Sequence, residues 1–186
     1  ALNRALAHFG FHISRYDHLV AFDGLPTRKK LEMLSREQGL PSGLHGLLNE
    51  LKQGYTTELV HARCKPVFQH EYALSRLKAE GMIVAVASNS MRATIDLMMR
   101  KSNLQRYLDL TVSTEDVRSG KPSPEIYQHA MSRLGLSPAE VLVVEDNENG
   151  IAAARAAGAR LMVVENVLDV TYDNIARHLT APEGSR

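Results

Sequence analysis

Three groups of polar residues in the second half of the chain could carry phosphate chemistry. Ser88-Asn89-Ser90 directly follows the apolar run MIVAVA, Lys121 lies in the stiff loop GKPSP, and Glu145-Asp146 closes the run VLVVED. A hydroxyl and backbone N–H groups at a strand-to-helix turn can cradle an anion. A fixed ammonium group can neutralise both a phosphate and a nearby carboxylate. Adjacent carboxylates repel each other unless a cation lies between them, and Mg²⁺ prefers oxygen ligands.

Each group also has a purely structural interpretation. Asn89 or Ser90 could cap the helix that follows them, and Asp146 or Asn147 could do the same for the next helix. Lys121 could be a solvated surface lysine, which is the usual situation of lysine. The three groups together, in this order, are more specific than any one of them, and they favour a phosphate site.

The elements that would position these groups alternate between strand and helix. Strands are predicted at four apolar runs, residues 82–88, 108–113, 141–146 and 160–166. Helices are predicted at 91–101, 124–135, 147–158 and 170–179. This alternation predicts an α/β fold with a Rossmann-like parallel sheet that is covered by helices on both faces. Ligands of such sheets bind at the carboxyl ends of the strands, where all three polar groups lie.

The first 65 residues have a different hydrophobic pattern, which is helical. Leu31 and Leu34 share one helix face, and Leu44, Leu48 and Leu51 recur at helical spacing. Only the stretch 19–22 could be a strand. We therefore predict two domains, a small helical domain at residues 1–65 and an α/β core at residues 66–186.

The order and context of the three groups resemble the haloacid dehalogenase-like (HAD) hydrolases. ASNS resembles the second motif of that family, GKPSPEIY is very similar to its lysine motif, and VVEDNENGIAAARAAG resembles its acidic motif. Residues 1–65 look like the helical cap that family members insert. Within the family, the phosphoglycolate phosphatase-like and beta-phosphoglucomutase-like subgroup is the most similar.

The resemblance implies roles for particular residues. Ser88 would hydrogen-bond the transferring phosphoryl group, with the backbone around Asn89 also binding phosphate, and Lys121 would bridge that group and the nucleophile. Glu145 and Asp146 would hold Mg²⁺. Thr27 and Arg28 lie where the cap of the family often contacts substrate.

The first motif of the family, D-x-D-G-[TV], has no counterpart in this sequence. VAFDGLPT contains one aspartate, Asp23, without a second aspartate two residues later, and no other D-x-D occurs. We interpret Asp23-Gly24 as a turn of the cap, and the nucleophile is then absent from this chain. The alternative is that Asp23 is the nucleophile.

The chain also begins inside a helical pattern, ALNRALAHFG, so we expect a family member that lacks the first core strand. In the family that strand lies between the strands of motifs two and four. Its absence predicts either a gap between the strands that end at Ser88 and Asp146 or direct pairing of these strands. A neighbouring strand built from residues 16–23 would instead make Asp23 the nucleophile.

The function that the resemblance implies is a Mg²⁺-dependent phosphohydrolase of small phosphorylated metabolites that works through an aspartyl-phosphate. The alternatives are a phosphosugar mutase and a catalytically inactive protein that binds phosphate and metal. A net charge of +1 predicts no nucleic-acid partner, and the longest apolar run, 82–87, is too short to cross a membrane. A single cysteine, Cys64, favours the cytoplasm, and we favour a monomer.

Overall fold

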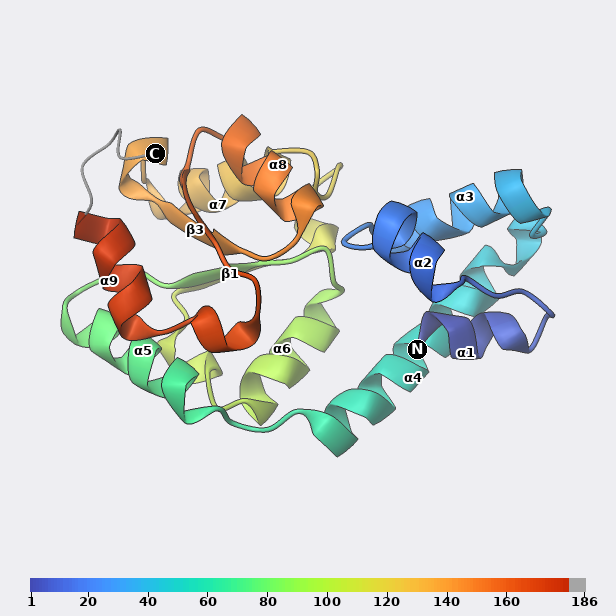
Figure 1. Cartoon of the computed structure of the whole chain (residues 1–186), viewed down its shortest axis with the longest axis horizontal. Helices are drawn as coiled ribbons and strands as arrows, with labels where there is room; N and C mark the ends of the chain where they lie inside the picture. The colour runs from blue at the N-terminus through green and yellow to red at the C-terminus, as the bar shows by residue number, and fades with distance from the viewer. Residues whose placement is uncertain (181–186) are drawn as a thin grey trace.

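The structure, a computed structural model, describes residues 1–180. Two parts lie side by side in it, a helical part (residues 1–63) and a sheet part (residues 68–180) (Figure 1). The helical part contains α1 (Leu2–Ala7), α2 (Arg15–Asp17), the π-helical turn η1 (His18–Phe22), α3 (Thr27–Gln38), η2 (Ser42–Leu44) and α4 (His45–Arg63).

The sheet part alternates helices and strands as the sequence predicts. Its helices are α5 (Phe68–Ala79), α6 (Arg92–Lys101), α7 (Glu125–Leu134), α8 (Glu148–Ala156) and α9 (Tyr172–Thr180). Its strands are β1 (Ala85–Ala87), β2 (Leu110–Val112), β3 (Leu142–Glu145) and β4 (Arg160–Val163). Short 3₁₀ turns connect them: η3 (Gln105–Tyr107), η4 (Thr114–Asp116), η5 (Pro138–Glu140) and η6 (Val167–Asp169).

The helical part has its own apolar core, which follows from the leucine spacing. Leu31 and Leu34 of α3 are buried against Leu6 of α1 and Leu48 of α4. Helix α3 ends at Gly39, whose φ of 72° lies in the left-handed region that glycine adopts without strain. These three helices therefore pack as a unit beside the sheet part.

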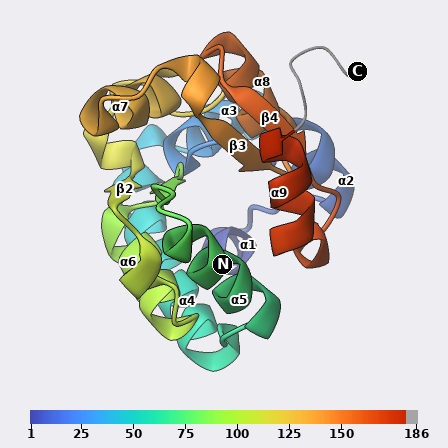
Figure 2. The ribbon, with the colours of Figure 1, turned by 90° about the vertical axis from the view of Figure 1, so that its left-hand side faces the viewer.

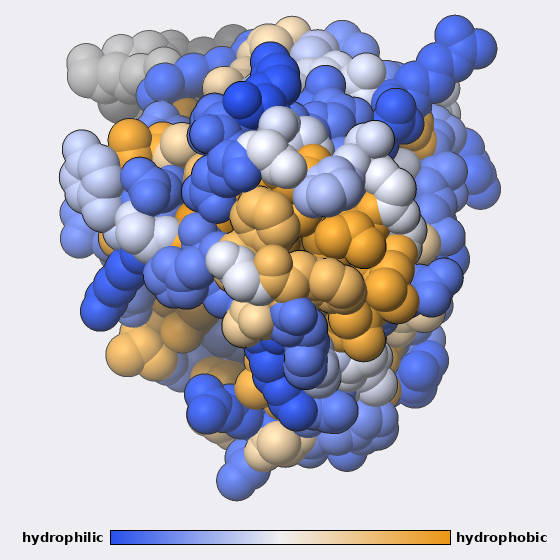
Figure 3. Space-filling view, turned by 90° about the vertical axis from the view of Figure 1, so that its right-hand side faces the viewer, coloured by the Kyte–Doolittle hydropathy of each residue, from blue (hydrophilic) through white to orange (hydrophobic). Residues whose placement is uncertain are grey.

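The stretch 19–22, which the sequence left open as a possible strand, forms the π-helical turn η1. The Ser14 hydroxyl accepts a hydrogen bond from the Asp17 N–H at 3.0 Å and so starts helical structure just before it. Leu19 and Val20 are 63% and 68% exposed. Figure 3 looks onto the end of the helical part and shows apolar side chains gathered on an otherwise largely hydrophilic surface.

Helices cover both faces of the strands. Val143 of β3 packs in one cluster with residues of α7 and α8, whereas its neighbours Leu142 and Val144 pack with Leu77 of α5 and Ile175 of α9. Successive side chains of a strand point to opposite faces. The α/β class that the sequence predicts, with covered parallel strands, is therefore confirmed.

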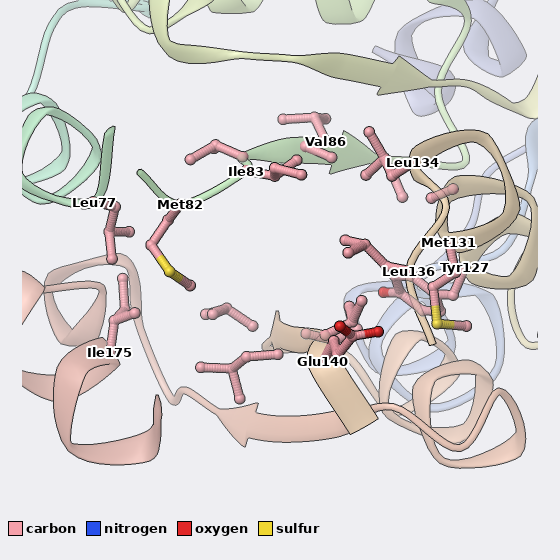
Figure 4. A pocket seen from close by; sticks show the side chains of 18 of the residues that line it. Leu77, Met82, Ile83, Val86, Tyr127, Met131, Leu134, Leu136, Glu140 and Ile175 are labelled. Carbon is pink, nitrogen blue, oxygen red and sulfur yellow. The ribbon is translucent and has the colours of Figure 1, made fainter. Parts of the chain in front are cut away.

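Within residues 1–180 the strands form two separate pairs, parallel β1–β2 and parallel β3–β4 (Figure 2). A cavity of about 400 Å³ lies between β1 and β3. In Figure 4, Ile83 and Val86 lie on the β1 side of this cavity, while Leu77 and Ile175 close one end. The predicted gap is confirmed, and residues 16–23 do not fill it because they belong to the helical part.

Within residues 1–180, the strands on both sides of the gap direct unpaired backbone N–H and C=O groups into it. Val84 O accepts from Asp109 N and Ser88 N donates to Val112 O, so the even-numbered residues of this stretch bond to β2. Residues of a strand alternate between its two edges, and Ala85 and Ala87 therefore direct their N–H and C=O groups into the gap. Ile83 is 48% exposed although its run was predicted to be buried on both faces, because this edge has no neighbouring strand among residues 1–180.

The helix ends follow local sequence signals. Gly135 ends α7 with a φ of 69°, and Ser137 and Glu140 form a capping box at the 3₁₀ turn η5. The strands are shorter than the apolar runs, since two-stranded pairs give each strand only one hydrogen-bonded edge. No helix within residues 1–180 is long and apolar enough to cross a membrane. Residues 181–186, at the end of the predicted core domain, lie outside the described part.

Candidate phosphate site at the strand ends

A second cavity, of about 350 Å³, lies where the helical part meets the carboxyl ends of β1 and β3. The sheet part contributes Ser88, Asn89, Lys121, Glu145 and Asp146 to its wall, so all three predicted groups meet in one place. The helical part contributes residues of α1, α3, α4 and the turn before α3. The fold thus brings together side chains that are far apart in the sequence.

Ser88 follows β1 directly, and its backbone N–H donates to Val112 O at 3.0 Å. Its hydroxyl accepts from Ser90 N at 3.2 Å, which fixes the turn but leaves the hydroxyl proton free to donate. Because Ser88 lines the cavity, an anion placed there could receive that proton in a hydrogen bond.

Asn89 acts as a clamp between three segments. Its amide nitrogen donates to Gly24 O at 2.9 Å and to Lys121 O at 3.0 Å, and its amide oxygen accepts from Lys121 N at 2.8 Å. A Cβ on Gly120 would lie 2.3 Å from the Asn89 amide oxygen, so glycine is required there for this close approach. The Asn89 side chain is therefore fully used in holding the lysine loop, and only its backbone remains for an anion.

Lys121 and Glu145 form an ion pair at the strand ends. Their side chains are 12% and 10% exposed. The Tyr127 hydroxyl donates to the same Glu145 oxygen at 2.6 Å, and the Asp146 N–H donates to the other at 3.2 Å. Burial opposes the charge of Glu145, but the Lys121 charge and the hydrogen bonds from Lys121 and Tyr127 outweigh it and hold the pKa of Glu145 below its usual range. Burial and the Glu145 carboxylate raise the pKa of Tyr127, so its phenol stays protonated and donates.

In this arrangement Glu145 pairs with Lys121, and its expected role as a Mg²⁺ ligand remains a prediction. Its carboxylate is shared among Lys121, Tyr127 and backbone N–H groups, and it packs so closely on α8 that a Cβ on Gly150 would lie 2.1 Å from its carboxyl carbon. Its contacts position Lys121.

Asp146 is the carboxylate that remains for a cation. It is exposed, lines the cavity, and its side chain makes no hydrogen bond or ion pair within the described residues. No group of three or more His, Cys, Asp or Glu side chains with metal-site geometry occurs among residues 1–180. Mg²⁺ commonly keeps several waters and binds through one or two carboxylates plus substrate phosphate. The residues present fit such an ion, and they do not form a complete protein cage for it.

Asp23 and Gly24 form a turn, as the sequence predicts, and this turn contacts the sheet part. The Asp23 carboxylate accepts from Asn147 Nδ2 at 2.7 Å, and its backbone oxygen accepts from Asn149 Nδ2 at 2.7 Å. Asn147 also caps α8, because its amide oxygen accepts from Asn149 N at 3.0 Å. Asp23 thus lies at the end of a helical turn, with Asn147 bound to its carboxylate, and not at the end of a core strand.

The two predicted substrate contacts differ in position. Thr27 lines the cavity at the start of α3. Arg28 is not among the lining residues, and its side chain is 88% exposed and paired with Glu32 at 2.9 Å.

Sequence reasoning missed two cavity lysines, Lys30 of α3 and Lys52 of α4. Helix periodicity could have found Lys30, because it follows Thr27 at i+3 on the same face. Burial lowers the pKa of Lys52. Burial also lowers the pKa of Lys30; the Asp23 charge partly opposes this shift, and the Lys52 charge adds to it.

A parallel α/β fold with a fixed lysine, a hydroxyl turn and an exposed carboxylate at its strand ends has the groups that an anion site needs. Comparison with known proteins places the chain more narrowly. The model of the haloacid dehalogenase-like hydrolase family matches residues 1–164. The chain therefore belongs to the haloacid dehalogenase-like hydrolases.

Among curated proteins, the chain is similar to a phosphorylated carbohydrates phosphatase of Thermotoga maritima, with 30% identity over 73% of this chain and 62% of that protein. It is also similar to a bifunctional riboflavin kinase/FMN phosphatase of Arabidopsis thaliana, with 36% identity over 53% of this chain and 26% of that protein. The chain thus spans less than two thirds of these relatives.

Among solved structures, a beta-phosphoglucomutase from Clostridium difficile superposes with a TM-score of 0.81 at 16% identity, over 95% of this chain and 86% of that one. CbbY from Rhodobacter sphaeroides, solved with phosphate, superposes with a TM-score of 0.79 at 20% identity, over 89% and 77% of the two chains. At these identities the two structures support the fold.

Proposed function

We propose that the cavity at the strand ends is the phosphoryl site of a Mg²⁺-dependent phosphohydrolase that acts on a small phosphorylated metabolite. The observation that carries the proposal is the fixed position of Lys121 at the strand ends. Its ammonium group pairs with Glu145 and lies 4.9 Å from the centroid of the Tyr127 ring, and its backbone N–H donates to Asn89. A lysine fixed so tightly beside an anion cradle is suited to stabilising charge on a transferring phosphoryl group. The phosphatase activities named for several relatives support the same reaction class.

In this proposal each residue has one task. The Lys121 ammonium neutralises the phosphoryl oxygens, the Ser88 hydroxyl donates a hydrogen bond to one of them, and the backbone after Asn89 completes the cradle. Asp146 would hold Mg²⁺, which when bound supplies positive charge against the phosphate. Residues 1–65 would form the cap over this site and residues 66–186 the core.

The nucleophile is proposed to come from a further strand in the gap. The inward-facing N–H and C=O groups of Ala85 and Ala87 on one side, and those of Leu142 and Val144 on the other, could each pair with a strand running parallel to β1 and β3. Such a strand would end beside Lys121, where an aspartate oxygen could attack phosphorus as the ester oxygen leaves. Water would then hydrolyse the acyl phosphate and release inorganic phosphate.

The first test is to read the coding DNA that precedes the Ala1 codon and to express the chain together with any in-frame segment found there. We expect an apolar strand that ends in D-x-D-G. The extended protein should then release phosphate from small phosphate esters when Mg²⁺ is added.

Changing the first aspartate of that motif to asparagine, or Lys121 to methionine, should abolish turnover, whereas changing the exposed Lys29 should not. If no such motif precedes Ala1, or if the extended protein binds phosphate without turnover, the chain is a phosphate-binding protein.

A further inference from the structure

The helical wall of the phosphate cavity carries two ammonium groups that the proposed reaction does not use. Lys30 projects from α3 and Lys52 from α4, and both line the cavity that also contains Ser88 and Lys121. The two helices pack against each other through the leucine core of the helical part. The positions of both lysines are therefore set by packed helices.

These two lysines lack the counter-ion that Lys121 has. Lys121 is paired with Glu145. Neither Lys30 nor Lys52 makes an ion pair within residues 1–180. Asp23 is the carboxylate that acts on Lys30, and its own hydrogen bond is to Asn147.

Such an arrangement is unfavourable unless an anion joins it. Removing an ammonium group from water costs free energy, and two neighbouring ammonium groups also repel each other. Burial lowers the pKa of both groups, which agrees with their half-buried position facing the cavity. An anion bound between them would offset both effects.

We propose, on the basis of the proposed function, that the substrate is a phosphate ester with a second anionic group, either a carboxylate or a further phosphate. Lys30 and Lys52 bind this second group at the helical wall. Ser88 and Lys121 bind the phosphoryl group that is removed. The cavity of about 350 Å³ has room for a metabolite of a few carbon atoms that spans the two walls. Esters that carry only a neutral end would leave both cap lysines unpaired, and they would bind more weakly.

The test compares probes that differ in one charge. Calorimetric titration of the 186-residue protein with Mg²⁺ present uses inorganic phosphate, ethyl phosphate and carboxymethyl phosphate, the last two having similar length. We expect carboxymethyl phosphate to bind about tenfold more tightly than ethyl phosphate, because one charge-assisted contact contributes about that much. Propyl phosphate and 1,3-propanediol bisphosphate form a second matched pair with a phosphate as the distal anion.

The variants Lys30→Met and Lys52→Met should each remove most of this preference and leave the affinity for inorganic phosphate within about twofold. Lys29→Met is the matched control, because Lys29 is on the same helix, is 67% exposed and pairs with Glu32. Circular dichroism confirms that each variant is folded. NMR gives a second readout after reductive methylation of the lysines with carbon-13. Titration with carboxymethyl phosphate should shift the Lys30 and Lys52 methyl signals.

Equal affinity for the members of each pair, or equal losses for all probes in the variants, would overturn the two-anion proposal. The outcome is separable from failure of the proposed function. If Lys121→Met abolishes binding of inorganic phosphate while the charge preference is missing, only the two-anion proposal fails. If carboxymethyl phosphate binding depends on Lys30 and Lys52 but no probe depends on Lys121, the phosphohydrolase site fails and the anion site on the cap remains. If no probe binds, both fail.

Discussion

Lys121 and Glu145, 24 positions apart in the chain, form an ion pair at the carboxyl ends of the strands with both side chains about nine-tenths buried. The pair fixes the ammonium group where a phosphoryl group would bind. Because Tyr127 and backbone N–H groups satisfy the remaining lone pairs of Glu145, the carboxylate can be buried without a metal ion.

Replacing Glu145 by glutamine should destabilise the protein strongly. The substitution leaves the Lys121 ammonium group buried without a counter-charge, and breaking one partner of a buried pair costs about 3–5 kcal/mol. Urea unfolding of the wild type and the variant measures this difference. Glu165→Gln, at an exposed position, is the control and should change the free energy of unfolding by less than about 0.5 kcal/mol. An effect of Glu145→Gln as small as that of the control would show that the pair does not hold the site.

The same pair predicts how stability depends on pH. The pKa of Glu145 is lower in the folded state than its value of about 4.3 in the unfolded chain. The unfolded state therefore takes up a proton first as the pH falls. The stabilisation by the pair is complete above about pH 4.5 and is lost as the pH falls through the folded pKa. Urea midpoints between pH 7 and pH 3 should fall more steeply for the wild type than for Glu145→Gln, and parallel curves would contradict this.

The strand and helix pattern of the sheet part could be predicted from the sequence because it depends on local signals. The apolar runs predicted the strands, and Gly135 and the Ser137–Glu140 capping box are local signals at the end of α7 and at η5. The sequence left the stretch 19–22 open because four apolar or small residues do not distinguish a strand from one helical turn. The Ser14 cap favours the turn.

The residues that the sheet part contributes to the cavity could be predicted, but their contacts could not. The strand-end positions brought Ser88, Lys121 and Asp146 into one cavity, as expected for a parallel sheet. The sequence could not show that Glu145 would turn toward Lys121, because that choice depends on where the loop 120–124 lies in space. Lys52 was missed for a similar reason: its place on the cavity follows from helix packing and not from any spacing to the other site residues.

Gly150 should not tolerate alanine, although it lies inside a helix. Alanine in place of glycine normally stabilises a helix by up to about 1 kcal/mol. At Gly150, however, a Cβ would lie 2.1–2.4 Å from the carboxylate atoms of Glu145, which Lys121 and Tyr127 hold in place. We expect Gly150→Ala to destabilise by about 1–3 kcal/mol through this overlap.

Gly54 is the matched control, because it lies within α4 and a Cβ there meets nothing within 4 Å. Gly54→Ala should raise the thermal midpoint while Gly150→Ala lowers it. If both substitutions stabilise the protein, the Glu145 carboxylate is free to move away from α8, and the tight support of Lys121 is not present.

The Asn89 clamp predicts a coupled effect on the lysine loop and the cap turn. Asn89→Ala removes the hydrogen bonds to Lys121 and to Gly24 O, so two backbone segments lose their shared partner. We expect faster proteolysis in the loop 119–124 and in the turn 23–26, with a loss of stability of about 1–3 kcal/mol. Ser102→Ala, which removes a side-chain hydrogen bond at the end of α6, should leave both segments resistant. Cleavage of one segment without the other would show that Asn89 does not link them.

Hydrogen exchange should reveal the open strand edges directly. Ser88 N donates to Val112 O, and by alternation Val86 N also bonds to β2, whereas the N–H groups of Ala85 and Ala87 face the cavity between the strand pairs. Amide exchange followed by NMR should therefore be at least about tenfold faster at Ala85 and Ala87 than at Val86 and Ser88, because exchange is slow only where a hydrogen bond must first open. Equal protection along the strand would mean that the edge is paired. If a strand then enters the gap, these two amides should become protected while their neighbours stay unchanged, and this pattern would show that the incoming segment pairs with the open edge of β1.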